Sequence, residues 1–450
     1  MPVGGTGAKT GSAVGLRRLG LIGFTLSALS PAASIFITGS VLLKLAGTGT
    51  ALVLIVGAAI ATLAALLYAE VAGAAPHAGG IYAGLRLLLG VWASDITIAL
   101  TLMTAPAYLA FSAKGLARYL GAGTSMSGVL PIAGAALIAA GVGATLKLRS
   151  GILIAMALLV VELLAVGSLV GLAATGIVRP LSEVIAHPLM IGGGAPHPAN
   201  GMALAFATIA ATFACSGAVW GSYLGEETGQ KPPQFGSTLA LVGLIGALLV
   251  AVPLILVTLA IPDLVATLGT DSPLTTFVAG RAGDGFARLL GFVIVAAIFA
   301  NLLTMTIALS RFVFATCREG IWPAWVGSWL GRLDRRGVPV VATLALVIIA
   351  LPLLLLSEQT LVIALSAELI SPLLVALAVV VGRRSARGVR YRVPAYPLLP
   401  LVCAVLACAF LLLEWNDAQT GRKGLMAMAV VILIQALTRA FLRWRRRLSG

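Results

Sequence analysis

Two long apolar stretches of the sequence, residues 20–40 and 206–228, carry breaks that could bind a small polar molecule. Each stretch is long enough to cross a bilayer as a helix. Each is interrupted at mid-length by residues that weaken a helix, at 27–31 in the first stretch and at 215–217 in the second. Lipid cannot satisfy the backbone groups that a break sets free, so a broken helix persists only where protein or a polar ligand fills the gap.

The ends of the half-helices indicate which ligand would fit. An N-terminal end offers N–H groups and a positive dipole that suit a carboxylate, and a C-terminal end offers carbonyl groups that suit an ammonium group or another cation. Two broken helices that cross near the membrane midplane could therefore hold a zwitterionic amino acid with few charged side chains. The alternative for each break taken alone is a kink that binds no ligand.

A third candidate is Glu162, which lies in the middle of an apolar stretch between Val161 and Leu163. A carboxyl group inside a membrane is costly and is a functional hypothesis by default. If it were shielded from water, it could exchange a proton near neutral pH. The hypothesis is that Glu162 is a protonation or coupling site. The alternative is a structural acid that is bonded to the hydroxyl groups of neighbouring helices.

The composition identifies an integral membrane protein. Of the 450 residues, 60% are hydrophobic and only 10% are charged, whereas a soluble domain has roughly 25% charged residues. The net charge of +15 is concentrated in short loops, which argues against a nucleic-acid-binding surface. Three histidines and four scattered cysteines form no metal-ligand or catalytic spacing, so we expect no cofactor, no metal and no enzyme activity. A channel is also disfavoured, because there is no repeated selectivity loop.

The elements that position the candidate residues are expected to be membrane helices. The apolar runs predict an all-α protein with twelve of them: 19–45, 50–73, 92–119, 127–146, 151–176, 201–224, 236–260, 285–314, 338–356, 360–381, 397–414 and 424–441. Most Lys and Arg residues lie on the same side of the membrane as the two termini. Basic loops usually face the cytoplasm, so both termini are expected on the cytoplasmic side of the cell (inner) membrane.

The two broken helices, the first and the sixth, start from opposite sides of the membrane. This predicts two inverted five-helix repeats, at 19–176 and 201–381. The other segments are a cytoplasmic tail at 1–18, an extracellular loop at 177–200, and helices 11 and 12 with a basic tail at 382–450.

Several sequence motifs occur in a consistent order along nearly the whole chain. They are Gly20–Gly23 with Ser30-Pro31 and Gly39, YAE…PHAGGIY at 68–82, FACSG…YLGEET at 213–228, SR at 310–311, REGIWP at 318–323 and YRVPAYPLLP at 391–400. In this combination the chain resembles the amino acid–polyamine–organocation (APC) superfamily of secondary transporters. The resemblance implies the inverted-repeat fold, alternating access, and an amino acid or related amine as substrate.

The resemblance also implies substrate contacts from the backbone of the two breaks and from side chains of helices 3, 8 and 10. The implied contact residues are Ser27, Ala28, Ser30, Pro31, Ala32, Phe213, Ala214, Cys215, Ser216 and Gly217, with Met103, Pro106 and Tyr108 as candidate walls. Trp220 is a candidate gate, with a packing role as the alternative. Many sodium-independent relatives have a lysine in helix 5 at the place of a coupling ion; this chain has none there, which puts the lysine-based mechanism in doubt.

Other polar residues have open alternatives. Glu226 and Glu227 could pair with Arg17, Arg18 or Arg86 in a cytoplasmic gate, or form a solvated helix end. Asn301, Thr304 and Thr306 could line the cavity, contribute oxygens to a sodium site, or bond neighbouring helices. Glu70 and His77 lie near the cytoplasmic end of helix 2, where His77 is expected to be structural.

The sequence therefore predicts a secondary active transporter, a symporter or antiporter, for an amino acid that is small or neutral. Transport would be coupled to protons or occur by exchange. The alternatives are a sodium-coupled amino acid symporter and a transporter of an amine such as a polyamine or ethanolamine. A cationic substrate usually needs a carboxylate or an aromatic cage, and the absence of an acid at either break mildly favours the neutral amino acid.

Overall fold

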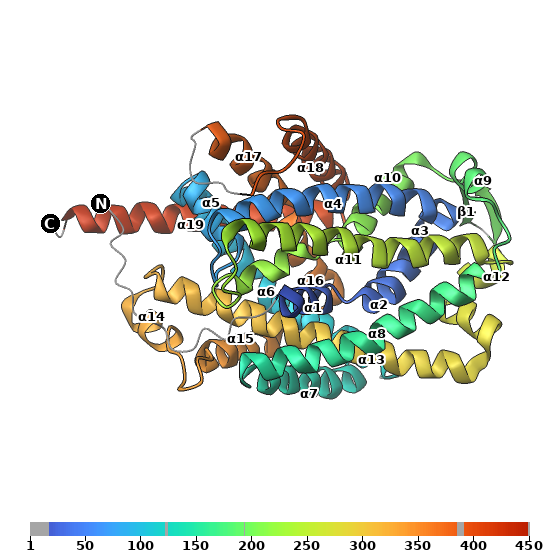
Figure 1. Ribbon diagram of the computed structural model, residues 1–450, viewed down its shortest axis with the longest axis horizontal. Helices are drawn as coiled ribbons and strands as arrows, with labels where there is room; N and C mark the ends of the chain where they lie inside the picture. Colours follow the sequence, from blue (N-terminus) through green and yellow to red (C-terminus); the bar gives the residue numbers. More distant parts are fainter. Residues whose placement is uncertain (1–17, 122–124, 193, 385–390, 449–450) are drawn as a thin grey trace.

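A computed structural model describes residues 18–121, 125–192, 194–384 and 391–448. Within these residues the protein is almost entirely helical, and ten helical stretches are long and apolar enough to cross a membrane. The long helices α4, α11, α8 and α13 run along the longest dimension of the molecule (Figure 1). This arrangement confirms the predicted class, an all-α membrane protein.

The first stretch is broken where the sequence predicted it. Helix α1 (Arg18–Leu29) ends before Ser30, and α2 (Pro31–Ala33) continues into the π-helical turn η1 (Ser34–Gly39) and α3 (Ser40–Ala46). Ser30 has φ 50°, in the left-handed region, which L-residues other than Gly, Asn and Asp rarely adopt. Pro31 follows it and has no N–H to continue the helical hydrogen bonds. After the turn η2 (Gly47–Gly49), α4 (Thr50–Ala74) returns across the molecule.

The second stretch is also broken as predicted. Helix α10 (Gly201–Ala214) ends at the segment 215–217, and the 3₁₀ turn η3 (Ala218–Leu224) follows. The break lies beside α4, because Gly57 of α4 allows close packing against α10. A Cβ at Gly57 would lie 2.8 Å from the backbone nitrogen of Thr212, so a larger residue would push the two helices apart.

The other helices agree with the predicted spans to within a few residues at most ends. They are α6 (Val91–Tyr119), α7 (Met126–Ala144), α8 (Leu148–Ala174), α11 (Pro232–Ala260), α15 (Val340–Leu353), α18 (Leu398–Asn416) and α19 (Gly421–Leu448). Two short helices, α5 (Ile81–Leu88) and α14 (Ala324–Leu330), were not predicted. Helix α13 (Pro273–Arg318) begins earlier than the predicted residue 285, with a non-helical residue at Gly283.

The predicted continuous helix 360–381 is interrupted. It consists of α16 (Glu358–Leu365), the 3₁₀ turn η4 (Ser366–Ile370) and α17 (Ser371–Arg384). Pro372 lies just after the turn and has no N–H for the carbonyl of residue 368, which accounts for the interruption. This 3₁₀ turn within the span was not predicted, and it carries an acidic residue, as described below.

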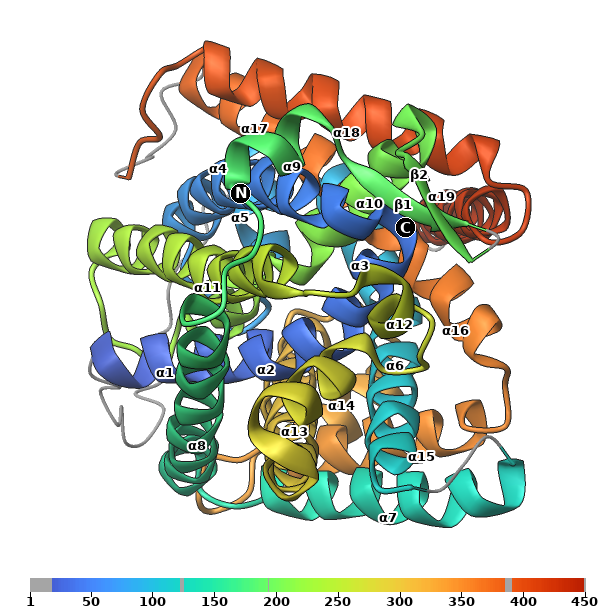
Figure 2. The same cartoon turned by 90° about the vertical axis from the view of Figure 1, so that its right-hand side faces the viewer.

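The predicted loop 177–200 contains short elements. They are α9 (Leu181–Ala186) and an antiparallel pair, β1 (Leu189–Gly192) and β2 (Ala195–Pro198), in which Leu189 lies opposite Pro198. Figure 2 views the end of the molecule at which these elements lie, together with α12 (Leu264–Leu268). Helices α5 and α14 lie at the other end (Figure 1), which we call the α5 end.

Candidate functional site

The break of the first stretch is held by a side chain from α8. Oε1 of Glu162 accepts a hydrogen bond of 2.7 Å from the backbone N–H of Ala32 and one of 3.0 Å from the hydroxyl of Ser30. Glu162 is fully buried, and no partner for its Oε2 is found within the described part of the chain. The free N–H groups at the start of a helix need such acceptors, so Glu162 acts here as a remote cap.

The other side of the same break is held from α13. The side-chain amide of Asn301 donates a hydrogen bond to the carbonyl of Ala28, and Oδ1 of Asn301 accepts one of 3.4 Å from the hydroxyl of Tyr108. The hydroxyl of Ser30 also lies 3.3 Å from the carbonyl of Ala297. The backbone groups that this break sets free are therefore largely satisfied by protein.

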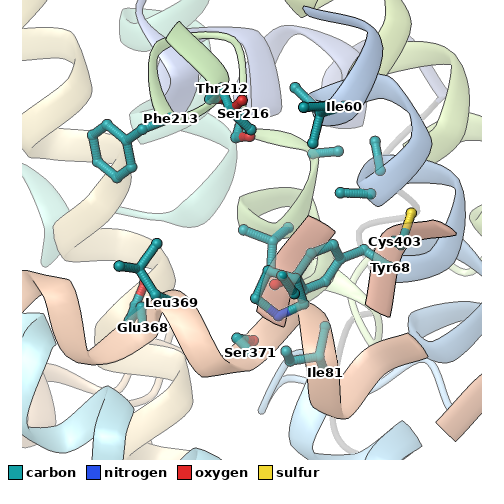
Figure 3. Close-up of a pocket in the computed structure, with 18 of the residues that line it drawn as sticks. Ile60, Tyr68, Ile81, Thr212, Phe213, Ser216, Glu368, Leu369, Ser371 and Cys403 are labelled. Atoms are coloured by element: carbon teal, nitrogen blue, oxygen red, sulfur yellow. The ribbon is translucent and has the colours of Figure 1, made fainter. Parts of the chain in front are cut away.

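A cavity of about 210 Å³ lies at the break of the second stretch. Its walls come from α4, α6, α10, η3, η4, α17 and α18, with single residues from α5, α11 and α16. The lining includes Phe213, Cys215, Ser216, Gly217 and Trp220 among the predicted site residues. Figure 3 shows Thr212 and Ser216 on one side of this cavity, and Glu368 and Leu369 across from them.

The structure thus separates the predicted contacts into two groups. The residues named above line the cavity. The other predicted residues of the two breaks, α6 and α8 are not part of its wall: Ser27, Ala28, Ser30, Pro31, Ala32, Met103, Tyr108, Ala214 and Glu162. Tyr108 connects the two regions, because its ring lies 5.8 Å from the ring of Trp220 and its hydroxyl contacts Asn301.

Glu368 is a cavity residue that the sequence analysis missed. It lies in η4, the turn that interrupts the tenth predicted span, and it lines the cavity. Its Oε1 accepts a hydrogen bond of 2.6 Å from the hydroxyl of Thr104 on α6. An acid within an apolar span is a functional hypothesis by default, and the Ser-Pro pair at 371–372 marks a break. These two signals together could have identified the residue.

A row of aromatic rings leads from the cavity toward the α5 end. Trp220 stacks on Tyr223 with ring centres 6.0 Å apart, and Tyr223 meets Phe312 edge-on at 6.1 Å. Phe312 in turn contacts Tyr82, whose ring lies 5.7 Å from His77. These rings form a continuous row from Trp220 in the cavity wall to His77, before α5.

Charged side chains form a cluster at the α5 end. Arg318 pairs with Glu226, and Nε2 of His77 lies 3.1 Å from a carboxylate oxygen of both Glu226 and Glu319. Glu319 also pairs with Arg86 at 2.9 Å. These ion pairs join α5 and the segment after η3 to the end of α13.

The acidic partners differ from those expected. Glu226 pairs with Arg318, and Glu227 pairs with Arg311 at 2.7 Å, rather than with Arg18 or Arg86; Arg17 lies outside the described residues. The arginines of α13 are nearer because the end of α13 packs against η3 and the segment after it.

The surroundings of the cluster shift the pKa values of its members His77 and Glu226. Burial lowers the pKa of His77, and the opposing effect of Glu226 and Glu319 does not overcome it. Burial raises the pKa of the Glu226 carboxyl, but the hydrogen bond from Arg318 and the charges of His77 and Arg318 outweigh it, so this pKa lies below its ordinary value. His77 is therefore mainly uncharged near neutral pH and belongs to the cluster as a neighbour of Glu226 and Glu319 rather than as a cation.

Glu70 has a separate role on α4. It is fully buried and accepts two hydrogen bonds from Arg383 and one of 2.6 Å from the backbone N–H of Val393. The guanidinium of Arg383 also lies 4.6 Å from the ring centre of Tyr396. Glu70 thus attaches the segment before α18 to α4.

The comparison with known proteins gives one match. A model of the family described as amino acid permease matches residues 16–435, nearly the whole chain. No curated protein matches the chain significantly.

Proposed function

The chain belongs to the amino acid permease family, and we propose that it is a secondary active transporter that moves its substrate by alternating access. Family membership makes it a multi-pass membrane transporter of amino acids or amines. The proposed substrate is an amino acid, small or neutral, whose transport is coupled to protons or occurs by exchange. Sodium coupling and an amine substrate are the alternatives.

One observation carries this proposal: the cavity of about 210 Å³ lies directly at the break 215–217. A break inside a membrane helix is tolerated where it lines a cavity, and transporters bind substrates at such discontinuous helices. The volume suits a molecule of a few heavy atoms. We propose that Phe213, Cys215, Ser216 and Gly217 contact the substrate.

We propose twelve membrane spans in two inverted repeats. The ten apolar stretches include one from Arg18 to Ala74, which holds both the broken first helix and α4 and therefore represents two spans. The shorter apolar helix α15 supplies a twelfth. The breaks then open helices 1 and 6, and the α5 end, with its basic loops, would face the cytoplasm.

The remaining predicted residues receive roles around the cavity. We propose that Trp220 is a gate between the cavity and the α5 end, because its ring bridges Tyr108 and Tyr223. Glu226 and Glu227 would close the cytoplasmic path through their arginine partners. Glu162 is the proposed coupling residue, because it joins the broken first helix to α8 and one of its oxygens has no partner among the described residues.

Counterflow in proteoliposomes tests the function. Vesicles loaded with an unlabelled amino acid should accumulate the labelled form transiently, and empty vesicles should not. The measurement is repeated with a panel of amino acids and amines, with and without sodium, and with and without a pH gradient. Absence of counterflow for every member of the panel would contradict the proposed function.

A further inference from the structure

We propose that Glu368 binds the ammonium group of the substrate, and that the cavity selects amines without a carboxylate over amino acids. This inference rests on the proposed transport function and favours the amine alternative over the amino acid as its substrate. It reverses the sequence-based preference for a neutral amino acid, because that preference depended on the absence of an acid near the breaks.

The charge of the cavity wall is the first argument. Among the described residues that line the cavity, Glu368 is the only one with a carboxylate, and none is Lys, Arg or His. A carboxylate on the substrate would meet no positively charged side chain among these residues and would depend on the backbone of the break. An ammonium group would instead form a charge-assisted hydrogen bond, which is about twice as strong as a neutral one.

The position of the Glu368 carboxylate is the second argument. Thr104 donates to Oε1 and so fixes one oxygen. No hydrogen-bond partner of Oε2 is found within the described part of the chain, and Glu368 is absent from its seven salt bridges. Glu368 is half-buried at the cavity wall, so a cationic ligand would supply the charged partner that the described residues do not give it.

Aromatic side chains around Glu368 give the third argument. Tyr68, Trp220 and Tyr223 line the same cavity as Glu368. Aromatic rings attract ammonium groups through their electron-rich faces. A cavity wall with one carboxylate and several aromatic rings therefore suits a cationic ligand better than a zwitterionic one.

Matched pairs of ligands test this inference on the whole protein. Each pair is an amino acid and the amine that lacks its carboxylate: serine and ethanolamine, leucine and 3-methylbutylamine, phenylalanine and 2-phenylethylamine. Binding to the detergent-solubilised protein at pH 7 is measured by thermal shift, which avoids diffusion of amines through lipid. We expect the best amine to bind at least about tenfold more tightly than its parent amino acid. Equal or tighter binding of the amino acids would overturn the inference.

Variants then assign the effect to Glu368. Glu368→Gln should weaken amine binding at least about tenfold and leave amino acid binding nearly unchanged, and Thr104→Val should weaken amine binding less. Glu183→Gln, which removes an exposed charge on α9, is the matched control and should have no effect. An unchanged amine affinity in a folded Glu368→Gln protein would contradict the proposal.

Counterflow of 1,4-diaminobutane separates two kinds of failure. This dication crosses lipid poorly, and we expect the wild-type protein to exchange it. If amino acids exchange while amines neither bind nor exchange, the inference is wrong and the transport function stands. If no member of either class binds or exchanges, the proposed function is wrong, and the inference with it.

Discussion

Oε1 of Glu162 on α8 accepts a 2.7 Å hydrogen bond from the backbone N–H of Ala32, directly after the break of the first stretch. The residue is far away in the sequence, yet it satisfies a helix start that local side chains leave open. One helix therefore fixes where another resumes. If α8 moves relative to α2, this hydrogen bond must break, and if the bond stays intact, the two helices must move together. The contact is therefore suited to coupling the two helices.

Replacement of Glu162 should separate its capping role from its charge. Glu162→Ala leaves the N–H of Ala32 buried without an acceptor, at about 1–3 kcal/mol, whereas the hydroxyl of Ser30 keeps the carbonyl of Ala297. Glu162→Gln keeps a carbonyl acceptor and should lose much less stability. Thermal unfolding in detergent measures both, with Glu183→Gln as a control; equal melting temperatures of the Ala and Gln variants would contradict the capping role.

The coupling role of Glu162 makes a different prediction. Gln cannot release a proton, so Glu162→Gln should flatten the pH dependence of uptake into proteoliposomes and reduce accumulation driven by a pH gradient. Counterflow, which needs no gradient, should be affected less. Unchanged uptake with an unchanged pH dependence would show that Glu162 is not the coupling residue.

On the other side of the break in the first stretch, replacement of Asn301 should reduce the stability of the protein more than replacement of Tyr108. Asn301→Leu leaves the carbonyl of Ala28 without its donor, whereas Tyr108→Phe removes only a bond of 3.4 Å. We expect a loss of about 1–3 kcal/mol for the first variant and less than about 1 kcal/mol for the second. Melting temperatures of both and of the double variant measure this, and the double variant should resemble Asn301→Leu.

The breaks at 27–31 and 215–217 could be predicted because Ser-Pro and Ser-Gly within an apolar span are local signals. The side chains that hold these breaks could not be predicted, because hydrogen bonds such as that between Ala32 and Glu162 join residues far apart in the sequence. The same limit explains the acidic partners at the α5 end, which depend on how the end of α13 packs against the segment after η3.

Glu368 shows a different limit. The acidic side chain and the Ser-Pro pair at 371–372 were visible in the sequence. The span 360–381, however, reads as one apolar helix, and its sequence does not indicate which way Glu368 faces. The polar stripe of Thr97, Thr101 and Thr104 on α6 has helical spacing and could have indicated the facing wall. Only the packing of α6 against η4 brings Thr104 and Glu368 together.

The lowered pKa of His77 predicts that acid destabilises the α5 end. Below its ordinary pKa of about 6.5, an exposed histidine in the unfolded chain takes up a proton more readily than the buried one. The unfolded state then binds more protons, so stability falls as the pH falls below this value. We expect a lower melting temperature at pH 5.5 than at pH 7.5.

His77→Gln should reduce this difference between the two pH values, because glutamine does not titrate. The contribution of Glu226 does not interfere, since a lowered carboxyl pKa contributes stability that is lost only at still lower pH. His187→Gln, in the exposed segment after α9, is the matched control. A pH difference that persists fully in His77→Gln would assign it to other groups.

The buried pair of Glu70 and Arg383 should cost more to break than an exposed pair. Glu70→Gln leaves a guanidinium without its counter-charge next to a buried position, at about 3–5 kcal/mol. The matched control is Glu358→Gln, which removes the partner of Arg118 in a more exposed ion pair and should cost less than about 1 kcal/mol. The double variant Glu70→Gln/Arg383→Gln should be more stable than the sum of the two single changes implies, because it leaves no unpaired charge. Thermal unfolding of the four proteins gives this cycle, and strict additivity would show that the two side chains do not interact.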